Sequence, residues 1–189
     1  MRALMIVSLG AATLITGCAE GNPEMSEGEE HMALAEIVGQ AALISTDGEE
    51  VGTASLAKEG SRLEIQLGLA GLEPGTHALH LHTTGLCDAP DFKSAGGHLN
   101  PAGKAHGKLS EGGAHLGDLP NIDIPENGKI ALTVSVEGDA AANLATIFDA
   151  DGTALMIHTG ADDYKSDPAG AAGPRIACGV VQGVPSEEG

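Results

Sequence analysis

Aromatic residues are almost absent from this sequence of 189 residues, which has no Trp, one Tyr and two Phe. A hydrophobic core must therefore be built from Val, Leu, Ile and Ala, and the hydrophobic content of 42% excludes a chain that is disordered throughout. Basic residues are also scarce, because 9 Lys and Arg face 27 Asp and Glu, a net charge of −18. Such an acidic chain repels nucleic acid and anionic membrane surfaces, so no nucleic-acid partner is expected.

The first 18 residues, MRALMIVSLGAATLITGC, combine a basic residue, a short apolar run and a small residue before Cys18. This pattern predicts a secretory signal, since the apolar run is too short for a confident membrane span. The ending LITGC resembles a bacterial lipobox, which implies cleavage before Cys18 and acylation of that cysteine. An ordinary signal peptide with an incidental cysteine is the alternative. Ala19 follows Cys18, and we therefore expect a periplasmic protein with a lipid anchor in the outer membrane.

Cysteine is scarce as well, because only Cys87 and Cys178 remain once Cys18 is assigned to the leader. In an oxidising compartment two remaining cysteines favour one disulfide, and two buried free thiols are the alternative.

The rest of the chain divides into three parts. Residues 19–33 are acidic and rich in Gly, which predicts a flexible tether, and residues 185–189 form an acidic tail. Between them, residues 34–184 form a domain of short apolar or alternating runs separated by turns. These runs predict about eight strands and no convincing helix, at residues 34–46, 51–57, 62–70, 77–82, 129–136, 143–150, 153–158 and 175–183. The expected fold is all-β, an eight-stranded antiparallel Greek-key barrel or sandwich with two long functional loops, residues 83–127 and 159–174.

Histidines are concentrated around these two loops. In the predicted strand HALHLH, His80 and His82 share one face and Leu79 and Leu81 the other. By itself this pair fits either a polar solvent-facing edge or a metal site. Beyond it the chain places further imidazoles and one nearby carboxylate, at His98, His106, His115, Asp118 and His158.

Metal chemistry gives these seven side chains a common interpretation. Three histidines with one aspartate suit tetrahedral zinc, and four imidazoles suit copper(II). Two four-coordinate sites need more ligand positions than seven side chains supply, so one histidine must serve both metals through its two ring nitrogens.

Taken in order, five segments resemble the copper/zinc superoxide dismutase family and its bacterial periplasmic branch: HALHLH, SAGGHLNP, HLGDL, MIHTGADD and GPRIACGV. The resemblance runs from about residue 36 to 183. It implies copper at His80, His82, His98 and His158, and zinc at His98, His106, His115 and Asp118, with His98 as the bridge. It also implies that Cys87 pairs with Cys178.

The resemblance further implies the disproportionation of superoxide to dioxygen and hydrogen peroxide, with His98 as the proton donor and Arg175 beside the copper. Asp162, rather than Asp163, is the better match for the carboxylate that holds one copper-bound and one zinc-bound histidine. The alternatives are a solvated acidic pair and a surface role for Arg175. The counterpart of His77 in the family is structural and bonds backbone groups.

The sequence leaves four points open. A non-enzymatic copper- and zinc-binding lipoprotein on the same fold is the alternative function, and the chain could act as a monomer or a homodimer. The two loops carry both lysines and carboxylates, so the sign of the local charge around the site is undetermined. Ala171 stands where the family often has Asn, a departure that concerns the shape of the channel.

Overall fold

The computed structural model describes residues 35–185. The predicted leader and tether, and residues 186–189 of the predicted acidic tail, lie outside the described residues. Within residues 35–185, no helix combines the length and hydropathy of a membrane span.

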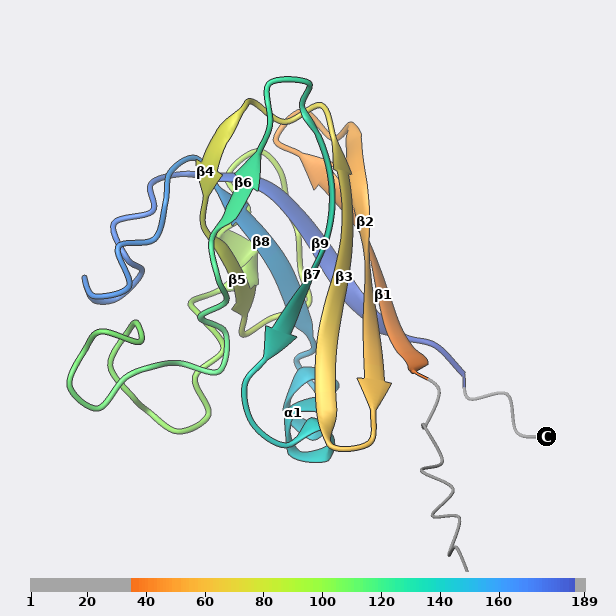
Figure 1. Cartoon of the computed structure of the whole chain (residues 1–189), viewed down its shortest axis with the longest axis vertical. Helices are drawn as coiled ribbons and strands as arrows, with labels where there is room; N and C mark the ends of the chain where they lie inside the picture. The colour runs from red at the N-terminus through yellow and green to blue at the C-terminus, as the bar shows by residue number, and fades with distance from the viewer. Residues whose placement is uncertain (1–34, 186–189) are drawn as a thin grey trace, which may run out of the picture. The chain divides into compact units, whose positions relative to one another are not determined.

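The described residues form mainly antiparallel strands, which confirms the predicted all-β class (Figure 1). Seven strands make one sheet in the order β5-β8-β9-β1-β2-β3-β7, and β4 pairs with β6 in a second sheet. The strands are β1 (Glu36–Ser45), β2 (Glu50–Glu59), β3 (Arg62–Ala70), β4 (Gly75–His77), β5 (Leu79–His82), β6 (Ile122–Ile124), β7 (Lys129–Val136), β8 (Thr153–His158) and β9 (Arg175–Gly183).

The core lies inside the curl of the larger sheet. Along β3, buried and exposed positions alternate, so Leu63, Ile65, Leu67 and Leu69 all face inward. One hydrophobic cluster takes residues from all seven strands of this sheet. Aliphatic side chains thus fill the interior, as the scarcity of aromatic residues required.

One predicted strand is wrong. Residues 143–150 were expected to be extended, but helix α1, Ala140–Ile147, occupies this segment. Asp139 caps the helix, because its carboxylate accepts a hydrogen bond from the Ala142 N–H at 3.0 Å. The alanine-rich start favours a helix, and a short apolar run alone does not distinguish the two structures.

Strand β5 carries the first two predicted metal ligands at an edge of the larger sheet. Its outer edge pairs with the first loop, defined here as residues 83–121 because Ile122 begins β6. The Leu81 N–H donates to the Gly117 carbonyl at 2.9 Å, and the Leu99 N–H donates to the Leu81 carbonyl at 2.8 Å. Only glycine fits at 117, since a Cβ there would collide with the Leu81 carbonyl oxygen. The loop therefore runs along the edge of β5, beside its two histidines.

Candidate metal centre

The structure brings together the four histidines that the sequence assigns to copper. His80 and His82 extend from β5, His158 ends β8, and His98 comes from the first loop. Each offers one ring nitrogen to a group in which these atoms all lie within 4.8 Å of one another, and all four residues are buried. On the other face of β5, Leu79 and Leu81 belong to the hydrophobic core.

Hydrogen bonding determines which nitrogen of each ring is free. His82 Nδ1 bonds to the Gly96 carbonyl at 3.0 Å, and His158 Nδ1 bonds to the Gly173 carbonyl at 2.9 Å. A ring nitrogen that faces a carbonyl carries the proton, so the opposite nitrogen keeps its lone pair. The nitrogens without a partner are His80 Nδ1, His82 Nε2, His98 Nε2 and His158 Nε2, all buried. Buried polar atoms without partners are costly, and four that converge fit a metal ion.

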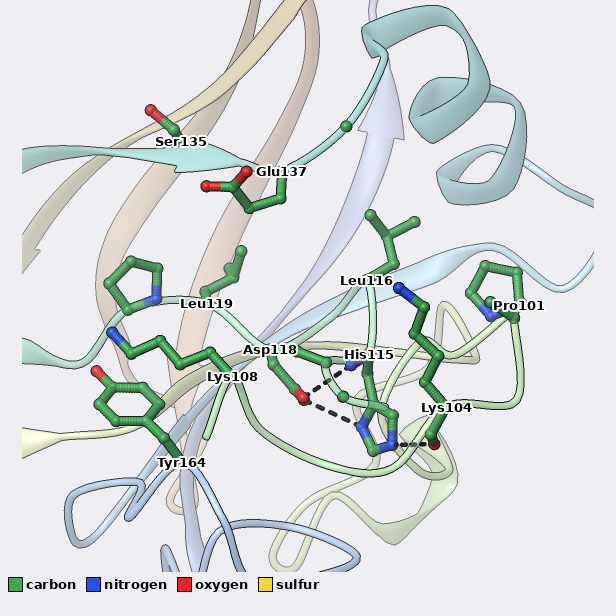
Figure 2. Close-up of a pocket in the computed structure, with 15 residues that line it drawn as sticks. Pro101, Lys104, Lys108, His115, Leu116, Asp118, Leu119, Ser135, Glu137 and Tyr164 are labelled. Atoms are coloured by element: carbon green, nitrogen blue, oxygen red, sulfur yellow. Dashed lines mark hydrogen bonds and ion pairs between the residues drawn. The ribbon is translucent and has the colours of Figure 1, made fainter. Parts of the chain in front are cut away.

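The predicted zinc ligands surround a single carboxylate oxygen. Asp118 Oδ1 lies 2.9 Å from His98 Nδ1, 3.0 Å from His106 Nδ1 and 3.0 Å from His115 Nδ1. The other oxygen, Oδ2, accepts the backbone N–H groups of Gly107 and His115, at 2.8 and 2.9 Å. These bonds fix the carboxylate from behind, as Figure 2 shows for His115 and Asp118. Three imidazoles and one carboxylate are a ligand set for tetrahedral zinc.

His98 belongs to both groups. Its Nδ1 faces Asp118, and its Nε2 is one of the four convergent nitrogens. The structure thus places the His98 imidazole between the two sets of ligands. The number of ligand positions had predicted one such shared histidine.

Asp162 provides a second link between the two sets. Its Oδ2 lies 2.9 Å from His80 Nε2, and its Oδ1 lies 2.9 Å from His106 Nε2, with all three side chains fully buried. Asp163 is exposed and instead accepts hydrogen bonds from the backbone of its own loop. Gly170 makes room for the contact between Asp162 and His106, since a Cβ at position 170 would collide with Asp162 Oδ1.

Burial keeps the imidazoles of His82, His98 and His158 neutral and ready to donate a lone pair. It lowers the pKa of His82 to about 2 and the pKa values of His98 and His158 to about 4. Burial alone would raise the pKa of Asp162, but hydrogen bonds from His80 and His106 outweigh it and lower that pKa to about 2. At neutral pH the centre therefore combines these three neutral imidazoles with the ionised Asp162 carboxylate.

Arg175 begins β9 and lies at the mouth of the four-histidine group. Its two terminal nitrogens donate to the Phe92 and Gly96 carbonyls at 2.5 and 2.6 Å. A cavity of about 320 Å³ is lined by this side chain together with His82, His98 and His158. No carboxylate is among its lining residues. Within a strongly acidic chain, the formal charge at this opening is therefore positive.

Cys87 and Cys178, which are 91 positions apart in the sequence, form a disulfide. The predicted pairing is confirmed. The bond attaches the first loop to β9, close to the carbonyls that hold Arg175. His77 bonds two backbone carbonyls, those of His158 and Glu73, as expected of a structural residue.

Two further residues of this region carry no motif that predicts them. The Asn121 side chain donates from Nδ2 to the Asp162 carbonyl at 2.9 Å, and its Oδ1 accepts the Asp162 N–H at 2.8 Å. The Tyr164 hydroxyl accepts the Asn121 N–H at 2.7 Å. Their roles follow from the way two distant loops meet, which no local pattern records.

Comparisons with known proteins agree with this geometry. The family model described as copper/zinc superoxide dismutase (SODC) matches residues 50–181. Cu-Zn superoxide dismutase 2 of Aquifex aeolicus is 45% identical over 150 residues, which cover 78% of this chain and 88% of that protein. The Cu-Zn superoxide dismutase of Caulobacter vibrioides is 39% identical over 72% of this chain and 80% of its own. The crystal structure of a SOD-like protein from Bacillus subtilis aligns with a TM-score of 0.69 and 35% identity, covering 75% of this chain and 96% of that one. This chain belongs to the copper/zinc superoxide dismutase family.

Proposed function

We propose that this chain disproportionates superoxide to dioxygen and hydrogen peroxide, with copper held by His80, His82, His98 and His158. Zinc is held by His98, His106, His115 and Asp118. Family membership supports the activity and both metals. The residue assignment rests on the four convergent ring nitrogens of the copper group, which are buried and have no partner. It also rests on the neighbouring carboxylate oxygen that faces three imidazoles.

Copper supplies one-electron transfer in both directions when bound, and zinc supplies a fixed positive charge beside His98. Arg175 attracts the superoxide anion into the opening and offers it guanidinium N–H donors. His98 Nε2 faces the space shared by the four imidazoles and, when it is not bound to copper, can carry a proton to the oxygen anion formed when superoxide is reduced. Two superoxide anions and two protons thereby give one dioxygen and one hydrogen peroxide.

Asp162 orients a ligand of each metal. Its two oxygens hold the far nitrogens of His80 and His106, which directs their other nitrogens toward the metals. Asp162→Asn replaces one acceptor oxygen by a donor, so one of these imidazoles loses its partner. We expect weaker metal retention, whereas Asp163→Asn, a change of the same kind at the exposed neighbour, serves as the matched control.

Metal analysis together with a superoxide-consumption assay tests the function. The wild-type chain is expected to hold one copper and one zinc and to consume superoxide. His98→Ala is expected to weaken both sites. Unchanged binding of both metals in that variant would contradict the bridge, and bound metals without superoxide consumption would favour the non-enzymatic alternative. No observation on this chain favours that alternative.

We also infer that the leader is cleaved before Cys18 and that this cysteine is acylated, on the strength of the LITGC segment. The protein would then be periplasmic and anchored to the outer membrane. In cells grown with radiolabelled palmitate, the wild type is expected to take up label and Cys18→Ser is not. An unlabelled wild type would refute the anchor. Analytical ultracentrifugation would distinguish a monomer from a homodimer, the two states that the sequence leaves open.

A further inference from the structure

Tyr164 touches both loops of the metal centre through opposite ends of the residue. Its backbone N–H donates to Asp162 Oδ1 at 2.6 Å. Its hydroxyl accepts the backbone N–H of Asn121, at the end of the first loop, at 2.7 Å. One residue therefore contacts both the carboxylate that orients His80 and His106 and the segment that lies beside that carboxylate.

These contacts close a ring of hydrogen bonds. Asn121 bonds the backbone of Asp162 twice, once as donor at 2.9 Å and once as acceptor at 2.8 Å. Tyr164 holds Asn121 through its hydroxyl and Asp162 through its N–H. The position of Asp162 is thus fixed at both its backbone and its side chain, and each of these bonds passes through Asn121 or Tyr164.

The backbone of Tyr164 shows that this arrangement has an energetic cost. Its φ is 59°, in the left-handed region that residues with a Cβ rarely adopt. Such conformations persist only where surrounding contacts impose them, and they concentrate at functional sites. Here the Leu109 N–H donates to the Tyr164 carbonyl at 3.0 Å, and Lys108 Nζ lies 4.1 Å from the centre of the ring.

The Tyr164 side chain does not belong to the hydrophobic core. Tyr164 is half-buried and forms, with Lys108, one wall of an open pocket of about 560 Å³ (Figure 2). A tyrosine that served only to fill space would not need a hydroxyl paired with a backbone N–H or a strained backbone.

We propose that Tyr164 is a positioning residue that locks the second loop, residues 159–174, onto the first and so fixes Asp162 between His80 and His106. The inference deepens the proposed function, because it concerns the residue that orients one ligand of each proposed metal site.

Hydrogen exchange of the imidazole N–H protons tests the proposal. The full chain carrying zinc and reduced copper is diamagnetic, so NMR can follow the Nε2 protons of His80 and His106, which bond Asp162. In Tyr164→Phe, which removes only the hydroxyl, these two protons are expected to exchange about tenfold faster. One lost hydrogen bond of about 1.4 kcal/mol corresponds to that factor. The Nδ1 protons of His82 and His158 bond carbonyls outside the ring of hydrogen bonds and serve as internal references.

Two further variants complete the experiment. Asn121→Ala breaks the same ring at its other member, so it is expected to accelerate the same two protons. Thr76→Val removes the hydroxyl that bonds Asp123 at 2.6 Å, two residues from Asn121 but outside the ring, and is expected to change neither.

Two results would overturn the proposal. Exchange of the His80 and His106 protons within twofold of the wild type in Tyr164→Phe would show that the hydroxyl does not fix Asp162. Equal acceleration of all four imidazole protons would show a general loosening instead of positioning. Failure of the wild type to bind metal would contradict the proposed function, and the same four protons would then be compared in the metal-free chain.

Discussion

At the scale of single residues, Ala171 occupies a backbone conformation that suits asparagine better. Its φ is 51°, and its side chain is exposed. Alanine pays about 1–2 kcal/mol in the left-handed region, which asparagine visits readily. Ala171→Asn is therefore expected to raise the free energy of unfolding by about 0.5–1 kcal/mol, measured by urea denaturation. Ala169→Asn lies in the same loop without a left-handed φ, and an equal gain there would contradict this explanation.

Arg175 is the residue on which capture of the anion depends. Arg175→Ala is expected to retain both metals and to lower the rate of superoxide consumption about tenfold or more, because electrostatic steering contributes factors of about 10–1,000. Raising the salt concentration should slow the wild type more than the variant, since salt screens the attraction that the mutation has already removed.

A second arginine provides the control for this prediction. Arg62 is exposed and paired with Glu59, so Arg62→Ala removes one positive charge away from the centre. Stopped-flow rates in which both alanine variants behave alike would exclude a specific role for Arg175.

At the scale of elements, helix α1 depends on its first residues. Asp139→Ala removes the carboxylate that caps Ala142 and is expected to cost about 1 kcal/mol of stability in chemical denaturation. Asp139→Asn should retain most of this stability, because asparagine caps helices about as well. A helix that starts without help from this side chain would show equal stability in all three proteins.

The same segment shows how far the sequence predicts the elements. The predicted strands at residues 62–70, 129–136, 153–158 and 175–183 agree with β3, β7, β8 and β9, where apolar runs are bounded by turn residues. Residues 143–150 have a similar apolar run but fold as the end of a helix and the turn after it, because the Asp139 cap lies upstream of the run. A local apolar pattern identifies most strands, but it does not take into account a helix cap that lies upstream of the run.

The sequence predicts the metal ligands but not the residues that support them. The seven ligand side chains lie in recognisable segments, and the structure brings them together as two groups that share His98. Asn121 and Tyr164 follow only from the contact between two loops that are separate in sequence. Their polar atoms bond backbone groups of the other loop, so neither residue belongs to a pattern that sequence alone displays.

At the scale of the whole molecule, the buried imidazoles make the metal-free protein sensitive to acid. His82, His98 and His158 have lowered pKa values, so below about pH 6.5 the unfolded chain binds protons that the folded chain does not. Stability is therefore expected to fall as the pH drops from about 6.5 to 4, by up to about 1.4 kcal/mol per pH unit for each imidazole. Above about pH 6.5 these groups contribute no pH dependence.

Thermal unfolding followed by circular dichroism at a series of pH values measures this effect. The metal-loaded protein is expected to show a dependence at least as steep, continuing below pH 4, because bound metals keep protons off these nitrogens in the folded chain while the unfolded chain still binds them. A metal-free protein whose stability stays constant between pH 6.5 and 4 would contradict the assignment of these three histidines as buried neutral groups.

The pairing between β5 and the first loop also protects the protein against self-association. Leu81 bonds Gly117 and Leu99 on the outer edge of β5, so backbone groups that could otherwise recruit another chain are covered. His98, His106 and His115 belong to that loop, so the bound metals help to hold it in place. Without the metals the loop would be less firmly attached to β5. The metal-free protein is expected to form oligomers in a concentration-dependent manner, detectable by light scattering, and added zinc to suppress them. Metal loading would then set colloidal stability as well as activity.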